Sequence, residues 1–235
     1  LMKILYIFPH PDDESFGPAP AISAQVRAGH RVYLLTLTKG EATRQRHRLN
    51  VSKQEMGEIR FREMQCVEKV LGLAGMTVLD LPDSGLKEMN PLHIEEAVEE
   101  YVKKIRPDVL VTYAVHGISG FHDHLVCHAV VKRSYCKFKE SGSGFPRRLA
   151  FFTRSGEIHT DGKFRLEASS DEEIDCIVPC NEEDMDKFHQ ALDCYETYQE
   201  VIRDSNVKKV VGPEVPFEFF GESMDPPVRD LVEKL

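Results

Sequence analysis

Short, nearly continuous apolar runs alternate along the first half of the chain with longer segments whose apolar residues recur at helical spacing. An unbroken apolar run of this length is typical of a strand buried on both faces, as in a parallel sheet. Strands separated by helices at this spacing predict right-handed βαβ units. We therefore predict an α/β fold, a doubly wound and mostly parallel sheet with helices on both faces. The predicted strands cover residues 3–8, 31–37, 77–81 and 108–113, and the predicted helices cover residues 19–28, 53–71 and 94–105.

The pattern weakens after a Ser-Gly-Ser-Gly segment that begins at Ser141 and predicts a loop. No linker is long enough to separate a second domain. We therefore predict one domain over residues 1–235, in which a core of residues 3–140 carries a small β/α elaboration at residues 141–235. The elaboration is predicted to contain short strands at 148–154 and 174–179, one long helix at 182–202, and a docked aromatic tail at 217–220.

Composition and charge exclude several classes of protein. Hydrophobic residues make up 41% and charged residues 29% of the chain, as in ordinary globular proteins. The 30 basic and 39 acidic residues give a formal net charge of −9, and so acidic a surface argues against a nucleic-acid partner. No apolar run approaches the roughly 20 residues of a membrane-spanning helix. A polar segment begins at Pro9, so we expect no signal peptide.

The cysteines are scattered and contain no Cys-x-x-Cys pair. In a chain without a signal peptide this usage is typical of reduced thiols. We therefore expect a cytoplasmic protein without disulfides, in which only Cys176 and Cys180 are close enough in sequence to meet locally. The six cysteines are Cys66, Cys127, Cys136, Cys176, Cys180 and Cys194.

A His-Pro-Asp-Asp-Glu motif, residues 10–14, follows the first predicted strand. Open parallel sheets bind ligands beyond the carboxyl ends of their strands, so this loop is well placed for a site. It lacks the Gly-x-Gly-x-x-Gly of a dinucleotide site. If Asp13 joined His10 on a metal, the neighbouring Asp12 would project elsewhere, where it could serve as a general base. The alternative is a polar turn in which an aspartate caps the next helix.

A second histidine-rich segment follows the fourth predicted strand and contains His122, Asp123 and His124. In a sheet of order 3-2-1-4-5, the first and fourth strands are neighbours at the point where the strand order reverses. Their loops then bring His124 within reach of His10, and two histidines with one aspartate suit a catalytic zinc with an open position. His128 lies one turn beyond His124, so we expect it to flank the site.

The two motifs together resemble those of the LmbE-like, or PIG-L, family of zinc-dependent N-acetylglucosaminyl deacetylases, and the resemblance covers about residues 3–135. It implies a Rossmann-like fold and a zinc ion, with iron as the alternative metal. It also implies that His10, Asp13 and His124 are the metal ligands and that Asp12 is the general base.

The resemblance further implies that Glu41, Arg60, Glu63 and Asp83 shape the substrate pocket. The alternative for these four residues is that they form surface salt bridges. The basic segment from Arg44 to Lys53 has two interpretations, a solvated loop or a lid that attracts an anionic aglycone.

The sequence departs from the family pattern at Phe121, where relatives carry a histidine that helps to stabilise the oxyanion. A phenyl ring cannot donate a hydrogen bond, and losing one such donor typically costs about 10²- to 10³-fold in rate. We predict that His122 takes this role. His116, or the metal alone, is the alternative.

These observations predict a zinc-dependent N-deacetylase, a hydrolase in which Asp12 activates water on the metal against the acetamide of an N-acetylglucosamine-containing small molecule or glycoconjugate. Two alternatives are open at this point. One is a zinc amidohydrolase that acts on a non-sugar amide, and the other is a non-catalytic, metal-binding Rossmann-like module. The sequence leaves open whether the chain forms a homo-oligomer.

Overall fold

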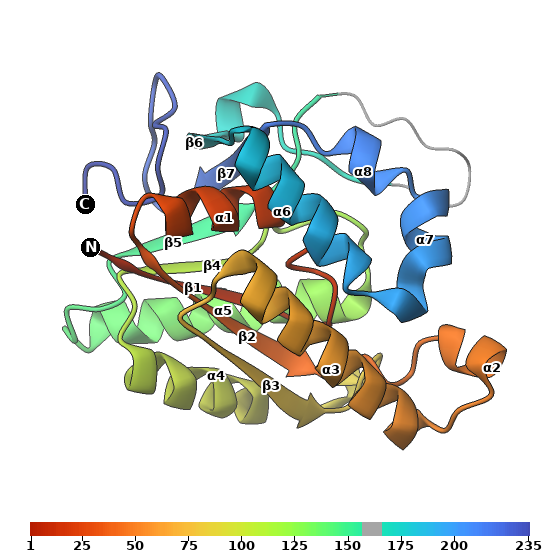
Figure 1. The fold of residues 1–235 in the computed structure, drawn as a ribbon. Helices are drawn as coiled ribbons and strands as arrows, with labels where there is room; N and C mark the ends of the chain where they lie inside the picture. Colours follow the sequence, from red (N-terminus) through yellow and green to blue (C-terminus); the bar gives the residue numbers. More distant parts are fainter. Residues whose placement is uncertain (157–165) are drawn as a thin grey trace.

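The computed structural model describes residues 1–156 and 166–235 and shows alternating strands and helices (Figure 1). The strands are β1 (Lys3–Phe8), β2 (Arg31–Thr38), β3 (Gly75–Leu81), β4 (Val109–Tyr113), β5 (Arg148–Phe152), β6 (Cys176–Pro179) and β7 (Glu214–Phe219). The α-helices are α1 (Ala19–Arg27), α2 (Gln45–Leu49), α3 (Lys53–Leu71), α4 (Pro91–Ile105), α5 (His122–Glu140), α6 (Glu182–Asp193), α7 (Gln199–Asp204) and α8 (Val207–Val210). Short 3₁₀ turns lie at η1 (Leu86–Glu88), η2 (Asp171–Glu173) and η3 (Glu196–Tyr198).

Within the described residues these strands form one sheet in the order β3-β2-β1-β4-β5-β7-β6. Strands β3, β2, β1, β4 and β5 are mutually parallel, and β7 runs antiparallel to both β5 and β6. The mostly parallel α/β fold and the strand order 3-2-1-4-5 are therefore confirmed. Strand β1 pairs with both β2 and β4, so the loops that follow β1 and β4 leave the sheet side by side.

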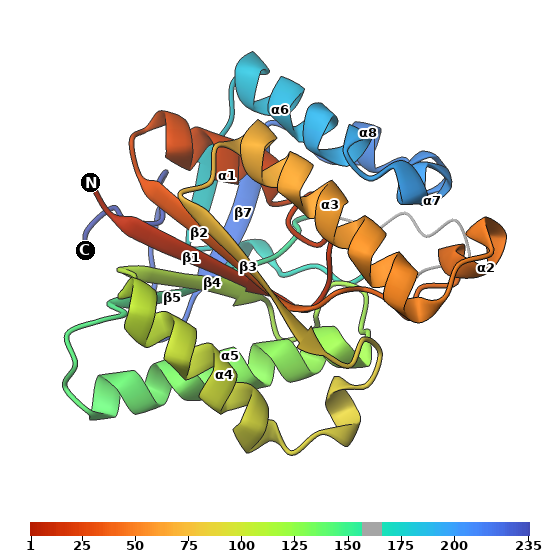
Figure 2. The same cartoon turned by 60° about the horizontal axis from the view of Figure 1, so that its bottom comes forward.

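Successive residues of β1 point to opposite faces of the sheet, and each face has its own apolar core. Ile4, Tyr6 and Phe8 belong to the core beneath α1, α3 and α6. Leu5 and Ile7 belong to the core beneath α4 and α5. Figure 2 shows these two layers of helices on opposite faces of the sheet. This double burial explains why the strand is an unbroken apolar run.

The helix predicted at 182–202 is wrong in its extent, because the structure divides it. Helix α6 ends at Asp193, Tyr195 leaves the helical region with ψ 71°, and η3 and α7 follow. The Thr197 N–H and hydroxyl both donate to the Glu63 carboxylate, at 2.8 and 2.9 Å, which ties the segment to α3 instead of letting the helix continue. This break turns the Tyr195 side chain toward the loop after β1.

The predicted aromatic tail at 217–220 lies within strand β7 and its end, so its description as a docked tail is wrong. Phe217 pairs with Phe152 of β5 on one side and with Cys176 of β6 on the other. The Phe217 side chain is fully buried. The segment is therefore an interior strand of the sheet.

The expectation of six reduced thiols is wrong for one pair, because Cys66 of α3 is joined by a disulfide to Cys194 at the end of α6. The two residues are 128 positions apart in sequence, a distance at which spacing gives no signal of pairing. Cys176 and Cys180 do not pair with each other and are both free.

A thiol count tests this disulfide. We expect protein unfolded without reductant to show four reactive thiols, because only Cys127, Cys136, Cys176 and Cys180 are free. The Cys66→Ser variant frees Cys194 and should show five in the absence of intermolecular oxidation. Six thiols in freshly purified, unreduced parent protein would show that the bond does not form.

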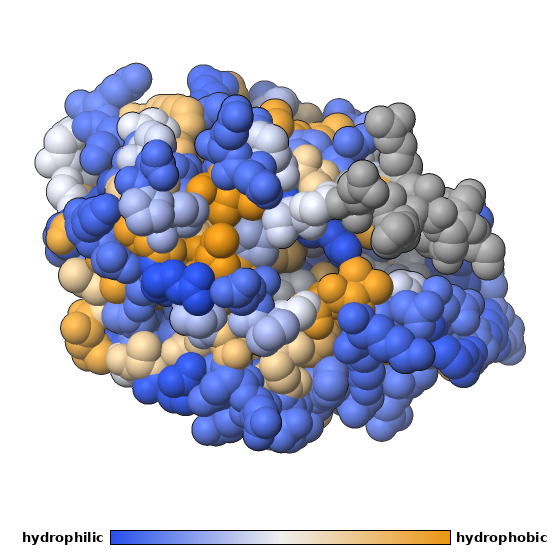
Figure 3. Space-filling model, turned by 90° about the horizontal axis from the view of Figure 1, so that it is seen from above, coloured by the Kyte–Doolittle hydropathy of each residue, from blue (hydrophilic) through white to orange (hydrophobic). Residues whose placement is uncertain are grey.

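The surface is polar over most of the face shown in Figure 3, where apolar side chains form separate groups among hydrophilic ones. Such a mosaic is common on globular proteins. No helix in residues 1–156 or 166–235 combines the length and apolar character that crossing a bilayer requires.

Candidate active site

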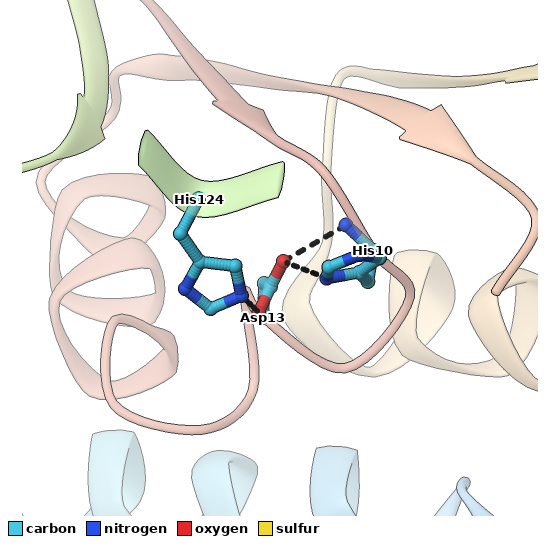
Figure 4. Close-up of side chains that lie close together, drawn as sticks. All are labelled: His10, Asp13 and His124. Carbon is cyan, nitrogen blue, oxygen red and sulfur yellow. Dashed lines mark hydrogen bonds and ion pairs between the residues drawn. The ribbon is translucent and has the colours of Figure 1, made fainter. Parts of the chain in front are cut away.

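The two histidine-bearing motifs meet at the carboxyl edge of the sheet. His10 and Asp13 lie in the loop that follows β1, and His124 lies in the first turn of α5, which follows β4. Figure 4 shows Asp13 between the two imidazole rings. Because β1 and β4 are neighbours in the sheet, His10 and Asp13 lie beside His124, which follows His10 by more than 110 positions in the sequence.

Potential metal-binding atoms of His10, Asp13 and His124 all lie within 4.8 Å of one another. Asp13 Oδ2 is 3.4 Å from His10 Nδ1, and Asp13 Oδ1 is 3.4 Å from His124 Nε2. The His10 backbone N–H donates to Asp13 Oδ2 at 2.8 Å, which fixes the turn of the loop. Asp13 and His124 are buried, and His10 is half-buried.

The surroundings of His124 leave its Nε2, which faces Asp13, as the ring nitrogen without a hydrogen. Its Nδ1 lies 2.9 Å from the Gly117 carbonyl oxygen, which can only accept, so Nδ1 carries the hydrogen. Burial lowers the pKa of His124, which favours the neutral ring. Gly117 has φ 61°, and a Cβ there would lie 2.8 Å from His124 Cβ, so this close approach requires glycine. The ring is thus arranged as a ligand whose orientation is set by its second nitrogen.

His10 is surrounded by carboxylates. Its Nε2 lies 3.2 Å from Asp123 Oδ2 and 3.4 Å from Asp83 Oδ1, on the opposite side of the ring from Asp13. Burial alone lowers the pKa of His10, but hydrogen bonds to Asp123 and Asp13 outweigh it and raise that pKa to about 10. The carboxylates around His10 therefore stabilise a positive charge at its ring.

These residues fit a divalent cation. Burial alone would raise the pKa of Asp13, but the electrostatic interaction with the neighbouring His124 imidazole and the hydrogen bond from His10 outweigh it and keep that pKa low, so the carboxylate is ionised. Tyr113 donates to Asp13 Oδ1 at 2.7 Å, and its ring stacks on His124 with centroids 4.3 Å apart. Two imidazoles and an oriented carboxylate are the ligand types found where a metal keeps an open position.

Asp12 diverges from Asp13 although the two are adjacent. Its Oδ2 accepts from Arg60 Nη2 at 2.7 Å, and the Arg60 side chain is only 1% exposed. Burial raises the pKa of Asp12 to about 6, and the charge of Arg60 limits the rise. The loop therefore offers one carboxylate to the cluster and a second one, held apart, that can exchange a proton near neutral pH.

The four residues predicted to shape a pocket lie in different places. Asp83 lies beside His10, and its backbone N–H donates to Glu41 at 3.0 Å, so both acids are at the carboxyl edge. Arg60 lies beneath Asp12 and also donates to the Pro11 carbonyl at 2.7 Å. Glu63 binds Thr197, as described above.

The remaining predicted histidines lie around the cluster. His122 is exposed at the start of α5, and its Nδ1 lies 3.5 Å from Lys87 Nζ. His116 Nε2 lies 3.4 Å from Ser169 Oγ. His128 lies one turn beyond His124, and its Nδ1 is 2.8 Å from the Tyr113 carbonyl oxygen. Neither His122 nor His116 belongs to the groups of potential metal ligands found among the described residues.

The basic segment at 44–53 forms α2 and the start of α3. Arg48 Nε lies 3.4 Å from Glu200 Oε2, and Arg48 Nη2 lies 3.4 Å from the Thr197 carbonyl oxygen. This arginine thus contacts the segment around η3 and α7. The role of the segment as a lid stays a prediction.

Sequence reasoning missed three residues of the site. Asp123 accepts from the N–H groups of Ser84 and Leu86, at 2.8 and 3.2 Å, while it contacts His10. Its place in the second histidine-bearing motif was a usable signal, because a carboxylate commonly accepts from a metal-binding histidine, although the histidine it contacts is His10 of the first motif. Tyr113 carried a weaker signal as the last residue of β4. Tyr195 lies far along the chain and gave no signal.

The chain is similar in sequence to two proteins with assigned activities. A 1D-myo-inositol 2-acetamido-2-deoxy-α-D-glucopyranoside deacetylase of Thermomonospora curvata is 30% identical over 153 residues, 56% of this chain and 52% of the relative. A mycothiol S-conjugate amidase of Streptomyces coelicolor is 31% identical over 150 residues, 55% of this chain and 50% of the relative. The matches thus span about half the length of these relatives.

A solved structure of the 4-carboxy-2-hydroxymuconate hydratase GalB from Pseudomonas putida has the same fold, with a TM-score of 0.67 and 12% identity over 95% of this chain and 98% of that one. The fold alone therefore does not fix the reaction. The family model described as "PIG-L: GlcNAc-PI de-N-acetylase" matches residues 5–135, a stretch that contains both motifs. Because that match covers more than half of the chain, the chain belongs to the PIG-L family.

Proposed function

We propose that this chain is a metal-dependent hydrolase that removes the N-acetyl group from an N-acetylglucosamine-containing small molecule or glycoconjugate. Membership of the PIG-L family and the names of the relatives support the reaction and the amino-sugar substrate. The proposed metal ligands are His10, Asp13 and His124, with zinc as the proposed metal. A zinc ion bound there would act as a Lewis acid toward the acetamide carbonyl and would lower the pKa of a water molecule at its open position.

The proposal rests chiefly on the different positions of two adjacent aspartates in one loop. Asp13 faces both histidines, whereas Asp12 is held by Arg60 and is left out of the ligand set. A site that only bound a structural metal would have no need for this second carboxylate. A hydrolase needs it, because the attacking water must lose a proton.

Asp12 is the proposed general base. Its raised pKa, about 6, makes it a stronger base than an ordinary aspartate and leaves it ionised at neutral pH. It would accept the proton of the water as the water attacks the acetamide carbon, and it would then return that proton to the departing amine. The products are acetate and the free amino sugar. Arg60 holds the Asp12 carboxylate in place throughout.

Metal-dependent acetate release tests the function. Protein stripped of metal and reloaded with zinc or ferrous iron is incubated with N-acetylglucosamine joined to a neutral inositol or to an anionic aglycone, and with an N-acetylated amino-acid amide. Acetate from the sugars alone supports the proposal. Acetate from the non-sugar amide alone identifies a different amidohydrolase, and metal binding without any acetate identifies a binding module. A preference for the anionic glycoside would support the basic segment as a lid.

The dependence of activity on pH tests the base. Activity should fall as pH decreases through the pKa of Asp12, because only the carboxylate can accept a proton. The charge of Arg60 lowers that pKa, so Arg60→Gln is expected to move the acid limb of kcat/KM to higher pH. Arg60→Lys should move it less.

Arg62→Gln is the matched control, since Arg62 is exposed on the same helix, and its profile should superimpose on that of the parent. An acid limb in Arg60→Gln that stays in place, or moves to lower pH, would contradict the assignment of Asp12. Both profiles are recorded with the same metal, so the metal's own effect on the limb cancels in the comparison.

A further inference from the structure

A tyrosine from the C-terminal part of the chain reaches the loop that carries the proposed base. Tyr195 is fully buried, and it follows Cys194 at the point where α6 ends. Its hydroxyl accepts a hydrogen bond from the Asp12 backbone N–H at 2.8 Å and donates one to Glu14 Oε1 at 2.7 Å. Tyr195 lies 183 residues from Asp12, outside the part of the chain that the family model matches.

The backbone of Asp12 requires such support. Its φ is 87°, in the left-handed region that side chains with a Cβ rarely adopt. A residue held there is strained and persists only where the surroundings enforce the conformation. The Asp12 carbonyl accepts from Ser15 N–H and Phe16 N–H, at 2.8 and 2.9 Å, which closes the turn on one side. The Asp12 N–H, on the other side of the residue, is held by its hydrogen bond to the Tyr195 hydroxyl.

Glu14 sets the direction of that hydroxyl. Its carboxylate is fully buried, and Oε1 accepts from both Tyr195 and Ser15 Oγ, the latter at 2.6 Å. Because the tyrosine hydrogen is directed to Glu14, a lone pair of the hydroxyl oxygen is left to face the Asp12 N–H. Glu14 is the acid of the His-Pro-Asp-Asp-Glu motif that is neither a proposed metal ligand nor the proposed base. Its hydrogen bond with Tyr195 gives it a structural role.

The same segment also supports the side chain of Asp12. The Arg60 guanidinium that binds Asp12 lies 3.9 Å from the ring centroid of Tyr198 and 5.6 Å from that of Tyr195. The backbone and the carboxylate of Asp12 are therefore both held, directly or through Arg60, by residues that follow α6. Figure 1 shows the chain passing from the end of α6 to α7 on the side of the molecule where the arrows of β2 and β3 end.

We propose that Tyr195 is a positioning residue that, oriented by Glu14, holds the Asp12 backbone in its left-handed conformation and so aims the carboxylate at the reacting water. This inference rests on the proposed function for its catalytic consequence, but not for the hydrogen bond itself. Tyr195 need not touch the substrate. Its effect on turnover would pass through the geometry of Asp12.

The test is Tyr195→Phe, which removes one oxygen atom and keeps the ring. We expect kcat to fall by about 10- to 100-fold, since small misplacements of a catalytic group have effects of that size. KM should stay within about threefold and metal content should be unchanged, because neither the ligands nor the pocket is altered. Glu14→Ala should likewise lower kcat while leaving KM and metal content unchanged. The double variant should be no worse than the more severe of the two single variants, because both remove the same support.

Hydrogen–deuterium exchange of the metal-free protein gives a readout that does not need activity. In Tyr195→Phe the peptide that covers residues 9–17 should exchange faster than in the parent, whereas peptides from β1, β2 and β4 should not. Tyr6→Phe is the matched control, since Tyr6 is equally buried and its hydroxyl bonds to Gln25 Oε1 at 3.0 Å on α1. It should lose a similar amount of thermal stability with no change in kcat or in exchange at 9–17.

The possible outcomes separate the two proposals. Unchanged exchange at 9–17 together with unchanged kcat in Tyr195→Phe would overturn the positioning role. A uniform rise in exchange, matched by Tyr6→Phe, would also overturn it and reduce Tyr195 to a stabilising residue. If the parent releases no acetate from any substrate while Tyr195→Phe still loosens the loop, the deacetylase proposal fails and the support of Asp12 stands. If Tyr195→Phe does not fold, the kcat of Glu14→Ala and its exchange at residues 9–17 test the proposal instead.

Discussion

Asp12→Asn is expected to lower kcat by about 10²- to 10⁴-fold, the range that a positioned general base contributes. Asparagine has nearly the same shape as aspartate, but its amide cannot accept the proton of the attacking water. The metal content of the variant should equal that of the parent, because the Asp12 carboxylate points to Arg60 and not to the ligand cluster. The measurement is turnover with saturating N-acetylglucosamine conjugate, beside metal analysis of the same sample.

Two further variants separate loss of the base from loss of structure. Asp12→Asn leaves the buried Arg60 guanidinium without its ionic partner, so a lower melting temperature is expected. The double variant Asp12→Asn with Arg60→Gln removes that unpaired charge and should recover stability without recovering turnover. Asp80→Asn is the charge control, since Asp80 is exposed on β3 and pairs with Lys39. Turnover of Asp12→Asn within tenfold of the parent would refute the base assignment.

Asp13→Ala is expected to abolish metal binding and to lower activity by at least about 10³-fold. The carboxylate of Asp13 lies between the two imidazoles, so its removal leaves two ligands that no longer share a central partner. Several kcal/mol of transition-state stabilisation by the metal would be lost, and each 1.36 kcal/mol is a factor of ten in rate. Metal analysis after gel filtration and acetate release measure the two effects.

Chelation of the parent should produce the same inactive state and, unlike the variant, should be reversed by added zinc. His93→Ala is the matched control for histidine loss elsewhere, because His93 is exposed on α4 and should bind metal only adventitiously. His124→Ala should behave as Asp13→Ala does. Metal retained at parental stoichiometry in both variants would place the metal at another group, for which His10, Asp83 and Asp123 are the second cluster that the described residues offer.

The parallel part of the sheet could be predicted from the sequence because double burial leaves a strong local mark. The run from Lys3 to Phe8 is apolar at every inner position, since alternate residues enter different cores. The same argument holds for β2 and β4. No comparable mark exists in the C-terminal part, where β6 has four residues and β7 alternates between buried and half-buried positions.

The error at 182–202 has a tertiary cause. The apolar spacing of this stretch suits a helix throughout, but contacts with other parts of the chain stop it. Glu63 of α3 binds Thr197, and the Cys66–Cys194 disulfide ties the residue that ends α6 to α3. Local propensity cannot anticipate contacts of such long sequence separation.

The proximity of His10, Asp13 and His124 could be predicted because a motif, a strand order and a family resemblance all pointed to one edge. The environment of Asp12 could not. The positive φ of this residue has no sequence signal in an Asp-Asp pair, and the hydroxyl that binds its N–H comes from a segment whose path depends on a helix break. The roles of His122 and of the pocket acids stay predictions.

Strand β6 has consequences for the order in which the chain assembles during synthesis. Strand β6 pairs with β7, and among the described residues it also forms a bridge between Cys176 and Val228. Both of these neighbours emerge from the ribosome after β6. Until residues 214–219 are available, β5 is an unpaired sheet edge, and such edges recruit other chains. A nascent chain arrested between β6 and β7 is therefore expected to be the most aggregation-prone stage of biosynthesis. Slowing translation at that stage would lower the yield of native protein more than slowing it elsewhere.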